Sequence, residues 1–151
     1  MTALNIDCVE GQNEPDKHFL VLESNEDDAF LIRRAFRALP FCSCYICRNS
    51  SEAKSYLLGA GMYADRSNFP RADAVITELR LGLESGENFI EWVRTEPGSK
   101  TLPVIVLAGG ISTHEAEALA RLNVDKVLVK PSDTSALKQT LASLAKELCS
   151  K

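Results

Sequence analysis

Five short apolar runs alternate with five amphipathic segments along most of the chain, and this alternation constrains the fold more than any other feature. The apolar runs have the length and composition of strands and lie at 18–23, 42–47, 74–78, 102–108 and 126–130. The other segments have helical periodicity and lie at 25–39, 49–58, 86–94, 112–122 and 132–148. Strands that alternate with helices form a parallel sheet with helices on both faces. The sequence therefore predicts a doubly wound α/β domain with right-handed crossovers.

Composition bounds the class of protein. The chain has 151 residues, which is about the length of one domain, and 45% of them are hydrophobic, enough for one sizeable core. The net charge of −4 argues against partners such as nucleic acid or an anionic membrane, because both need a basic surface. No apolar run approaches the roughly 18 residues of a membrane span, and the first residues lack the pattern of a signal peptide. We therefore expect a cytoplasmic protein with reduced thiols.

The two ends of the chain set the expected domain boundaries. Residues 1–17 are polar and contain Gly11 and Pro15, which predicts a flexible N-terminal lead-in. Residues 18–149 are expected to form a single domain, with no output domain after it.

Ionisable side chains follow several of the predicted strands. Glu23 ends the first, Glu78 the third and Lys130 the fifth. The carboxyl ends of parallel strands meet at one edge of a doubly wound sheet, where such folds place their functional cleft. We therefore expect two acids and one lysine to converge there.

Four stretches around these positions, in this order, resemble the receiver domains of bacterial response regulators. They are FLVLESNEDDAF, AVITELRLGLESGENF, LPVIVLAGG and VLVKPSD, and the resemblance covers residues 17–148. The insertion GMYADRSNFP before the third strand resembles single-domain receivers that pair with phytochrome-type histidine kinases. The resemblance implies a flavodoxin-like strand order of 2-1-3-4-5.

The resemblance also implies a mechanism, in which an aspartate takes a phosphoryl group from a histidine kinase. Mg²⁺ held by first-strand acids and a fifth-strand lysine neutralise the charge, and a Ser or Thr and an aromatic residue respond to it. Glu23, Lys130 and Pro131 match that set, and Pro131 is a candidate for a cis peptide bond. Four positions differ: Glu78 replaces the aspartate, Ser24 an acid, Ala108 the Ser or Thr, and Val127 the aromatic residue.

These substitutions predict a degenerate site. The extra methylene of Glu78 moves its carboxylate by about 1.5 Å, and a misplacement of about 1 Å can slow a positioned reaction roughly 10²-fold. The lost acid at Ser24 weakens a Mg²⁺ site, so we expect weak metal binding or none, and no other cofactor. We expect an ion pair between Glu78 and Lys130. Glu78 then either mimics the phosphoryl group or, as we favour, fills a pocket that has lost its switch.

The expected function is therefore protein–protein binding without enzymatic activity. The partner would be a histidine kinase or another signalling protein, and a homodimer through the fourth and fifth helices is plausible. One alternative is an active receiver that is phosphorylated elsewhere, at Asp27 or Ser85. A second is a small flavodoxin-like enzyme, against which the acidic stretch ESNEDD argues, because it repels phosphate.

Two other groups of residues invite a functional interpretation. Cys44 and Cys47 have the spacing of a zinc-ligand pair, but odd spacing in a strand points them to opposite faces, so we expect two small hydrophobic residues. Arg33, Arg34 and Arg37 are expected on the exposed face of the first helix, with part of a docking surface as the alternative.

Overall fold

The computed structural model describes residues 17–149, which form a five-stranded parallel sheet with helices on both faces. Its strands are β2 (Lys17–Leu22), β3 (Cys42–Cys47), β4 (Ala74–Thr77), β7 (Val104–Ala108) and β8 (Lys126–Val129). Their order across the sheet is β3-β2-β4-β7-β8, and every neighbouring pair is parallel. The predicted doubly wound fold and the order 2-1-3-4-5 are confirmed. No described helix is long and apolar enough to cross a membrane.

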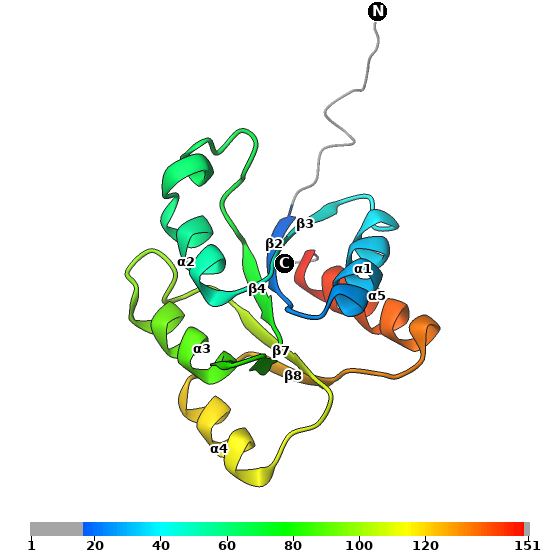
Figure 1. Cartoon of the computed structure of the whole chain (residues 1–151). Coiled ribbons are helices and arrows are strands. Elements are labelled where there is room, and N and C mark those ends of the chain that lie inside the picture. Colours follow the sequence, from blue (N-terminus) through cyan, green and yellow to red (C-terminus); the bar gives the residue numbers. More distant parts are fainter. Residues whose placement is uncertain (1–16, 150–151) are drawn as a thin grey trace, which may run out of the picture.

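Five α-helices cover the sheet. They are α1 (Glu26–Arg37), α2 (Ser50–Leu58), α3 (Gly86–Thr95), α4 (Thr113–Arg121) and α5 (Thr134–Cys149). Helices α1 and α5 lie side by side on one face, and α2, α3 and α4 lie on the other (Figure 1). Each predicted helix is present, with ends within a few residues of those expected from the sequence.

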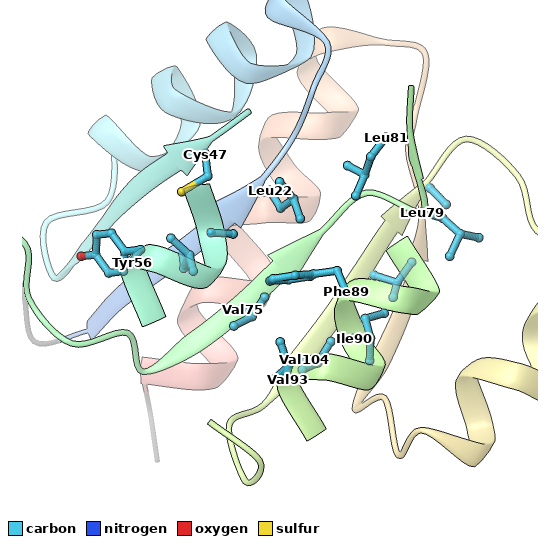
Figure 2. Packing of buried hydrophobic residues seen from close by; sticks show 14 of the residues in the cluster. Leu22, Cys47, Tyr56, Val75, Leu79, Leu81, Phe89, Ile90, Val93 and Val104 are labelled. Atoms are coloured by element: carbon cyan, nitrogen blue, oxygen red, sulfur yellow. The ribbon is translucent and has the colours of Figure 1, made fainter. Parts of the chain in front are cut away.

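Each face of the sheet has its own hydrophobic cluster. Phe19, Ile32 and Leu141 belong to the cluster beneath α1 and α5. Figure 2 shows the cluster on the other face, where Phe89 and Ile90 of α3 pack among strand side chains. The strands supply side chains to both clusters, because successive residues of a strand point to opposite faces. This is why the strands read as continuous apolar runs.

The cysteines of β3 follow the same alternation. Cys44 packs against the cluster under α1, whereas Cys47 is buried in the cluster under α2. They lie on opposite faces, as the odd spacing predicts, and cannot ligate one metal ion together.

Two small elements were not expected. A 3-10 helix, η2 (Gly61–Ala64), lies between the helix predicted at 49–58 and the strand predicted at 74–78. Its Tyr63 packs with Tyr45, Tyr56 and Phe69. The second element is a short antiparallel hairpin of β5 (Arg80–Leu81) and β6 (Glu84–Ser85) directly after the functional edge of β4.

The described chain begins within a strand, since β2 starts at Lys17. The predicted lead-in at 1–17 lies outside the described residues except for Lys17 itself, and the expected domain, 18–149, coincides with the rest of the described part.

Candidate functional site

The carboxyl edge of the sheet carries a cleft of about 530 Å³. Glu23 and Ser24 line it after β2, Glu78 after β4, and Lys130 after β8. The topology thus brings together residues that are more than a hundred positions apart, as the strand ends predicted. Glu23 and Glu78 are buried, at 2% and 8% exposure.

Lys130 lies among three carboxylates. Its Nζ is 2.9 Å from Glu23 Oε1, 2.8 Å from Asp28 Oδ2 and 2.5 Å from Glu78 Oε2. An ammonium group has three N–H donors and no acceptor, so these contacts use all of its donors. The ion pair expected between Glu78 and Lys130 is present, as one arm of a larger cluster.

Both oxygens of the Glu78 carboxylate are engaged. Oε2 contacts Lys130, and Oε1 accepts a hydrogen bond of 2.8 Å from the backbone N–H of Leu79. The side chain therefore folds back over its own chain. The backbone of Glu78 is fixed as well, because its N–H donates to Leu22 O at 3.0 Å.

The cluster has an excess of acid, and its electrostatics follow from that. Burial raises the pKa of Glu23 above its ordinary value, and its bonds to Lys130 and to the Asn25 N–H only partly oppose this. Burial alone would lower the pKa of the Lys130 ammonium, but hydrogen bonds to Asp28, Glu78 and Glu23 outweigh it and raise that pKa. Lys130 is therefore a fixed positive charge at neutral pH.

The two positions of the expected switch lack the groups for it. Ala108 ends β7 fully buried, with a methyl group in place of a hydroxyl. Val127 is 39% exposed on β8, an edge strand of the sheet. Neither side chain can hydrogen-bond to an anion in the cleft.

An ion pair crosses the mouth of the cleft and was not predicted. Arg80 Nη2 lies 3.1 and 3.0 Å from the two carboxylate oxygens of Glu115 on α4, and its Nη1 donates to Gly110 O at 3.0 Å. Glu115 also closes a capping box with Ser112. The Ser112 N–H and then Arg80 hold the pKa of Glu115 below its usual value. The hairpin after β4 is thereby joined to the loop before α4.

No family model matches the chain. Response regulator Rcp1 of Synechocystis sp. is 24% identical over 120 residues, which cover 79% of this chain and 80% of that protein. The probable methanogenesis regulatory protein FilR2 of Methanothrix harundinacea is 28% identical over 129 residues, 83% of this chain and 79% of that one.

Among solved structures, the phosphorylated cyanobacterial phytochrome response regulator RcpA superposes with a TM-score of 0.80. It is 25% identical, and the match covers 89% of this chain and 94% of RcpA. The chain is thus homologous to response-regulator receiver domains. These relatives are response regulators, and the similarity to RcpA supports the phytochrome-associated type.

Asp28 lines the same cleft, and the sequence interpretation missed it. It lies three residues after Asn25, whose side chain caps α1 by accepting from the Asp28 N–H at 2.9 Å. This third helical position directs the Asp28 side chain to Lys130. The spacing from Asn25 could have placed Asp28 in the first turn of the helix, but no sequence pattern gives the direction of its side chain.

The expectation for Pro131 was wrong. Every peptide bond among residues 17–149 is trans, including the one that joins Lys130 to Pro131. Trans is the more stable isomer before proline by about 0.5–1 kcal/mol. Lys130 reaches its three carboxylates with this isomer, and its N–H bonds to Ala108 O, so nothing in the local contacts calls for the other one.

The donor groups of the cleft do not fit the Mg²⁺ ion of working receivers. Magnesium needs anionic oxygens in a strict octahedron. Ser24 contributes no carboxylate, and the acids that are present all point at the Lys130 ammonium. Within the described residues, no group of three or more His, Cys, Asp or Glu side chains is arranged to hold a metal ion.

Proposed function

We propose that this receiver domain works by binding proteins without phosphorylation at the usual position and without catalysis. The observation that supports this most directly is the Lys130 cluster. The ammonium group that neutralises a phosphoryl group in a working receiver is already satisfied by three carboxylates. An incoming phosphoryl group would have to displace them.

The geometry of Glu78 supports the same proposal. A carboxylate that attacks phosphorus needs one oxygen aligned with the phosphoryl donor. Here Oε1 faces the Leu79 N–H and Oε2 faces Lys130. Attack would require the side chain to leave both partners and enter a cleft that already has an excess of negative charge.

The lack of a side chain that could bind a phosphoryl group and respond to it supports a constant conformation of the domain. A phosphorylation switch needs a hydroxyl to bind the new anion, and Ala108 has none. Instead, Arg80 already holds the loop before α4 through Gly110 and Glu115. On this proposal α4 presents the same surface at all times.

The partner we propose is a histidine kinase or another signalling protein. A solved structure with a similar fold is described as a phytochrome response regulator, so a phytochrome-type kinase is the first partner class to test. The homodimer through α4 and α5 stays a prediction.

The test is the intact mass of the protein after incubation with acetyl phosphate and Mg²⁺. We would compare wild type, Glu78→Asp and the double variant Glu78→Asp/Ser24→Asp. The proposal expects no added phosphoryl group on wild type and a clear gain on the double variant, which regains both the nucleophile and the second acid. A gain on Glu78→Asp alone would mean that one acid is enough for the metal.

Two results would contradict the proposal. Phosphorylation of wild type would show an active receiver, and peptide mapping would then separate Asp27 from Ser85. Asp27 is exposed on α1, whereas the Ser85 hydroxyl accepts from the N–H groups of Glu87 and Asn88 as the cap of α3. A wild type whose binding to a phytochrome-type kinase requires phosphorylation would also contradict it.

A further inference from the structure

Strand β3 is an edge of the sheet that residues 17–149 form. It pairs with β2 alone. The N–H groups of Lys17 and Glu23 donate to Phe41 O and Cys47 O. The backbone groups of the odd-numbered residues of β3 therefore point toward β2. The N–H and C=O groups of a residue in a strand point to the same side, and they alternate along the strand. The backbone groups of Cys44 and Ile46 therefore point outward.

No segment of the described chain hydrogen-bonds to that outer side of Cys44 or Ile46. Natural sheets normally cover, shorten or break such an edge. This one has six residues and contains neither proline nor a bulge. Among residues 17–149, nothing therefore prevents a further strand from pairing with Cys44 and Ile46.

One wall beside this edge is basic and partly apolar. Helix α1 packs against β3, and its Ile32 and Phe36 share a hydrophobic cluster with Cys44. Arg33 and Arg37 are exposed on this helix. Burial raises the pKa of the Cys44 thiol to about 11, and the two guanidinium groups oppose this rise. Phe30 lies about one turn before Arg33 and is 53% exposed. A strand added to β3 would run beside these side chains.

The other wall is a hollow of about 510 Å³ at the start of β3. Its lining comes from the first half of β3, from the start of β2, from α2 and from the loop after η2. The residues are Ser43, Cys44, Tyr45, His18, Phe19, Tyr56, Ser67, Asn68 and Pro70. That loop is held in place, because Arg66 donates to Phe69 O and Leu57 O, and Tyr56 donates to Pro70 O. Alternate side chains of an added strand would point into this hollow.

We propose that the outer edge of β3 binds an extended, acidic peptide segment of a partner protein by strand addition. The main-chain bonds would come from Cys44 and Ile46, and selectivity for acidic residues from Arg33 and Arg37. This is a known mode of peptide recognition for exposed sheet edges. The same two arginines disfavour a second copy of this chain at the edge, because they would face their own equivalents.

This site is separate from the carboxyl-edge cleft, and the inference does not depend on the state of Glu78. A Glu78→Asp variant is expected to bind the same peptide equally well. Failure of the proposed function and failure of this inference can therefore be told apart.

The experiment selects a displayed library of random twelve-residue peptides against the full chain. The strongest peptide is then synthesised and added to ¹⁵N-labelled protein, and amide hydrogen exchange is followed residue by residue. We expect enrichment of Asp and Glu, and slowed exchange at Cys44 and Ile46. Arg37→Glu should weaken binding about fivefold or more. Arg121→Glu is the matched control, because each arginine lies in the last turn of its helix, and it should change affinity less than about twofold.

Three results would overturn the inference. One is no enrichment above that obtained with an unrelated acidic protein. Another is a peptide that binds without protecting the Cys44 and Ile46 amides or without sensitivity to Arg37→Glu. The third is protection of the same amides that appears with protein concentration and no peptide, together with a dimer in gel filtration, which would assign the edge to a second copy.

Discussion

Lys130 determines whether the buried acids of the cleft are tolerated. Its side chain is 12% exposed, and those of Glu23 and Glu78 are 3% and 9% exposed. Removal of one member of a buried ion pair leaves an uncompensated charge, which costs about 3–5 kcal/mol. The cluster is thus a point where one substitution has a large effect.

The variant Lys130→Met tests this directly. We expect its free energy of unfolding at pH 7 to fall by about 3–5 kcal/mol, because three carboxylates lose their cation. Urea denaturation measures it. Lys126→Met is the control, since Lys126 pairs with Glu147 where both side chains are well exposed, and such pairs contribute at most about 1 kcal/mol. Equal losses in the two variants would contradict a buried role for Lys130.

Glu23 gives the protein a pH dependence of defined sign. Its pKa is raised in the folded state, so the folded protein binds more protons than the unfolded chain between the ordinary value and the raised one. Stability from this group is therefore present at low pH and is lost as pH rises through that window. Glu23→Gln removes the titration.

We expect the stability of Glu23→Gln relative to wild type to increase as pH rises from about 4.5, and to level off above the raised pKa. Urea denaturation of both proteins between pH 4.5 and 8 gives the difference. A difference that does not change with pH, or that changes in the opposite direction, would contradict a raised pKa for Glu23.

At the scale of elements, the start of α3 is packed directly against the backbone that carries Glu78. A Cβ atom added to Gly86 would lie 2.5 Å from Glu78 O and 2.8 Å from Leu79 Cα. The Gly86 N–H also donates to Leu79 O at 2.8 Å. Only glycine allows this approach, so the helix and the site are positioned together.

Gly86→Ala should therefore lower the free energy of unfolding by about 1–3 kcal/mol, because backbone atoms must move apart. It should also shift the NMR amide signals of Glu78 and Leu79. The control is Gly109→Ala, where an added Cβ meets nothing within 4 Å. A Gly86→Ala protein with wild-type stability and unshifted signals would contradict the close approach.

The elements that were predicted well are those whose signal is local. Asn49 and Ser112 cap α2 and α4. Each is followed three residues later by a glutamate, a spacing that marks a helix start in the sequence. The 3-10 helix η2 was not predicted from the sequence, because its Tyr63 packs against aromatic rings from other parts of the chain, those of Tyr45 and Phe69. The hairpin of β5 and β6 was not predicted either, because strands of two residues are too short to show a periodic pattern.

The site was predictable only to the extent that strand ends fix positions. The sheet topology brings Glu23, Glu78 and Lys130 together. The alternation of strands and helices in the sequence is enough to predict this, because it implies a parallel sheet whose carboxyl ends meet at one edge. Which atoms touch was not predictable. Asp28 and Arg80 reach the site from a helix and a hairpin, and their side-chain directions depend on packing that no sequence pattern records.

At the scale of the whole molecule, Arg94 joins three separate segments on the α3 side of the sheet. Its side chain, only 15% exposed, donates to the carbonyl oxygens of Lys100, Leu102, Leu122 and Asn123 and pairs with Asp125. These groups end α4 and enter β7 and β8. One guanidinium group thus donates hydrogen bonds to carbonyl oxygens in the segment before β7 and in the turn between α4 and β8.

Arg94→Lys should lower the free energy of unfolding by about 2–3 kcal/mol, because an ammonium group cannot match the planar set of donors. Thermal and urea denaturation give the value. Arg121→Lys, on the exposed surface of α4, serves as the control and should stay within about 0.5 kcal/mol. A tolerated Arg94→Lys would show that charge alone is needed there.

The ion pair of Arg80 and Glu115 connects α4 to the hairpin that follows Glu78, so binding at α4 can affect the cleft. A protein that binds the first turn of α4 would compete with Arg80 for Glu115. It would thereby change a contact that holds the hairpin after Glu78. Coupling between two sites has the same size from either end. If the domain works as proposed, a partner bound at α4 would in this way act on the carboxyl-edge cleft without any phosphoryl group.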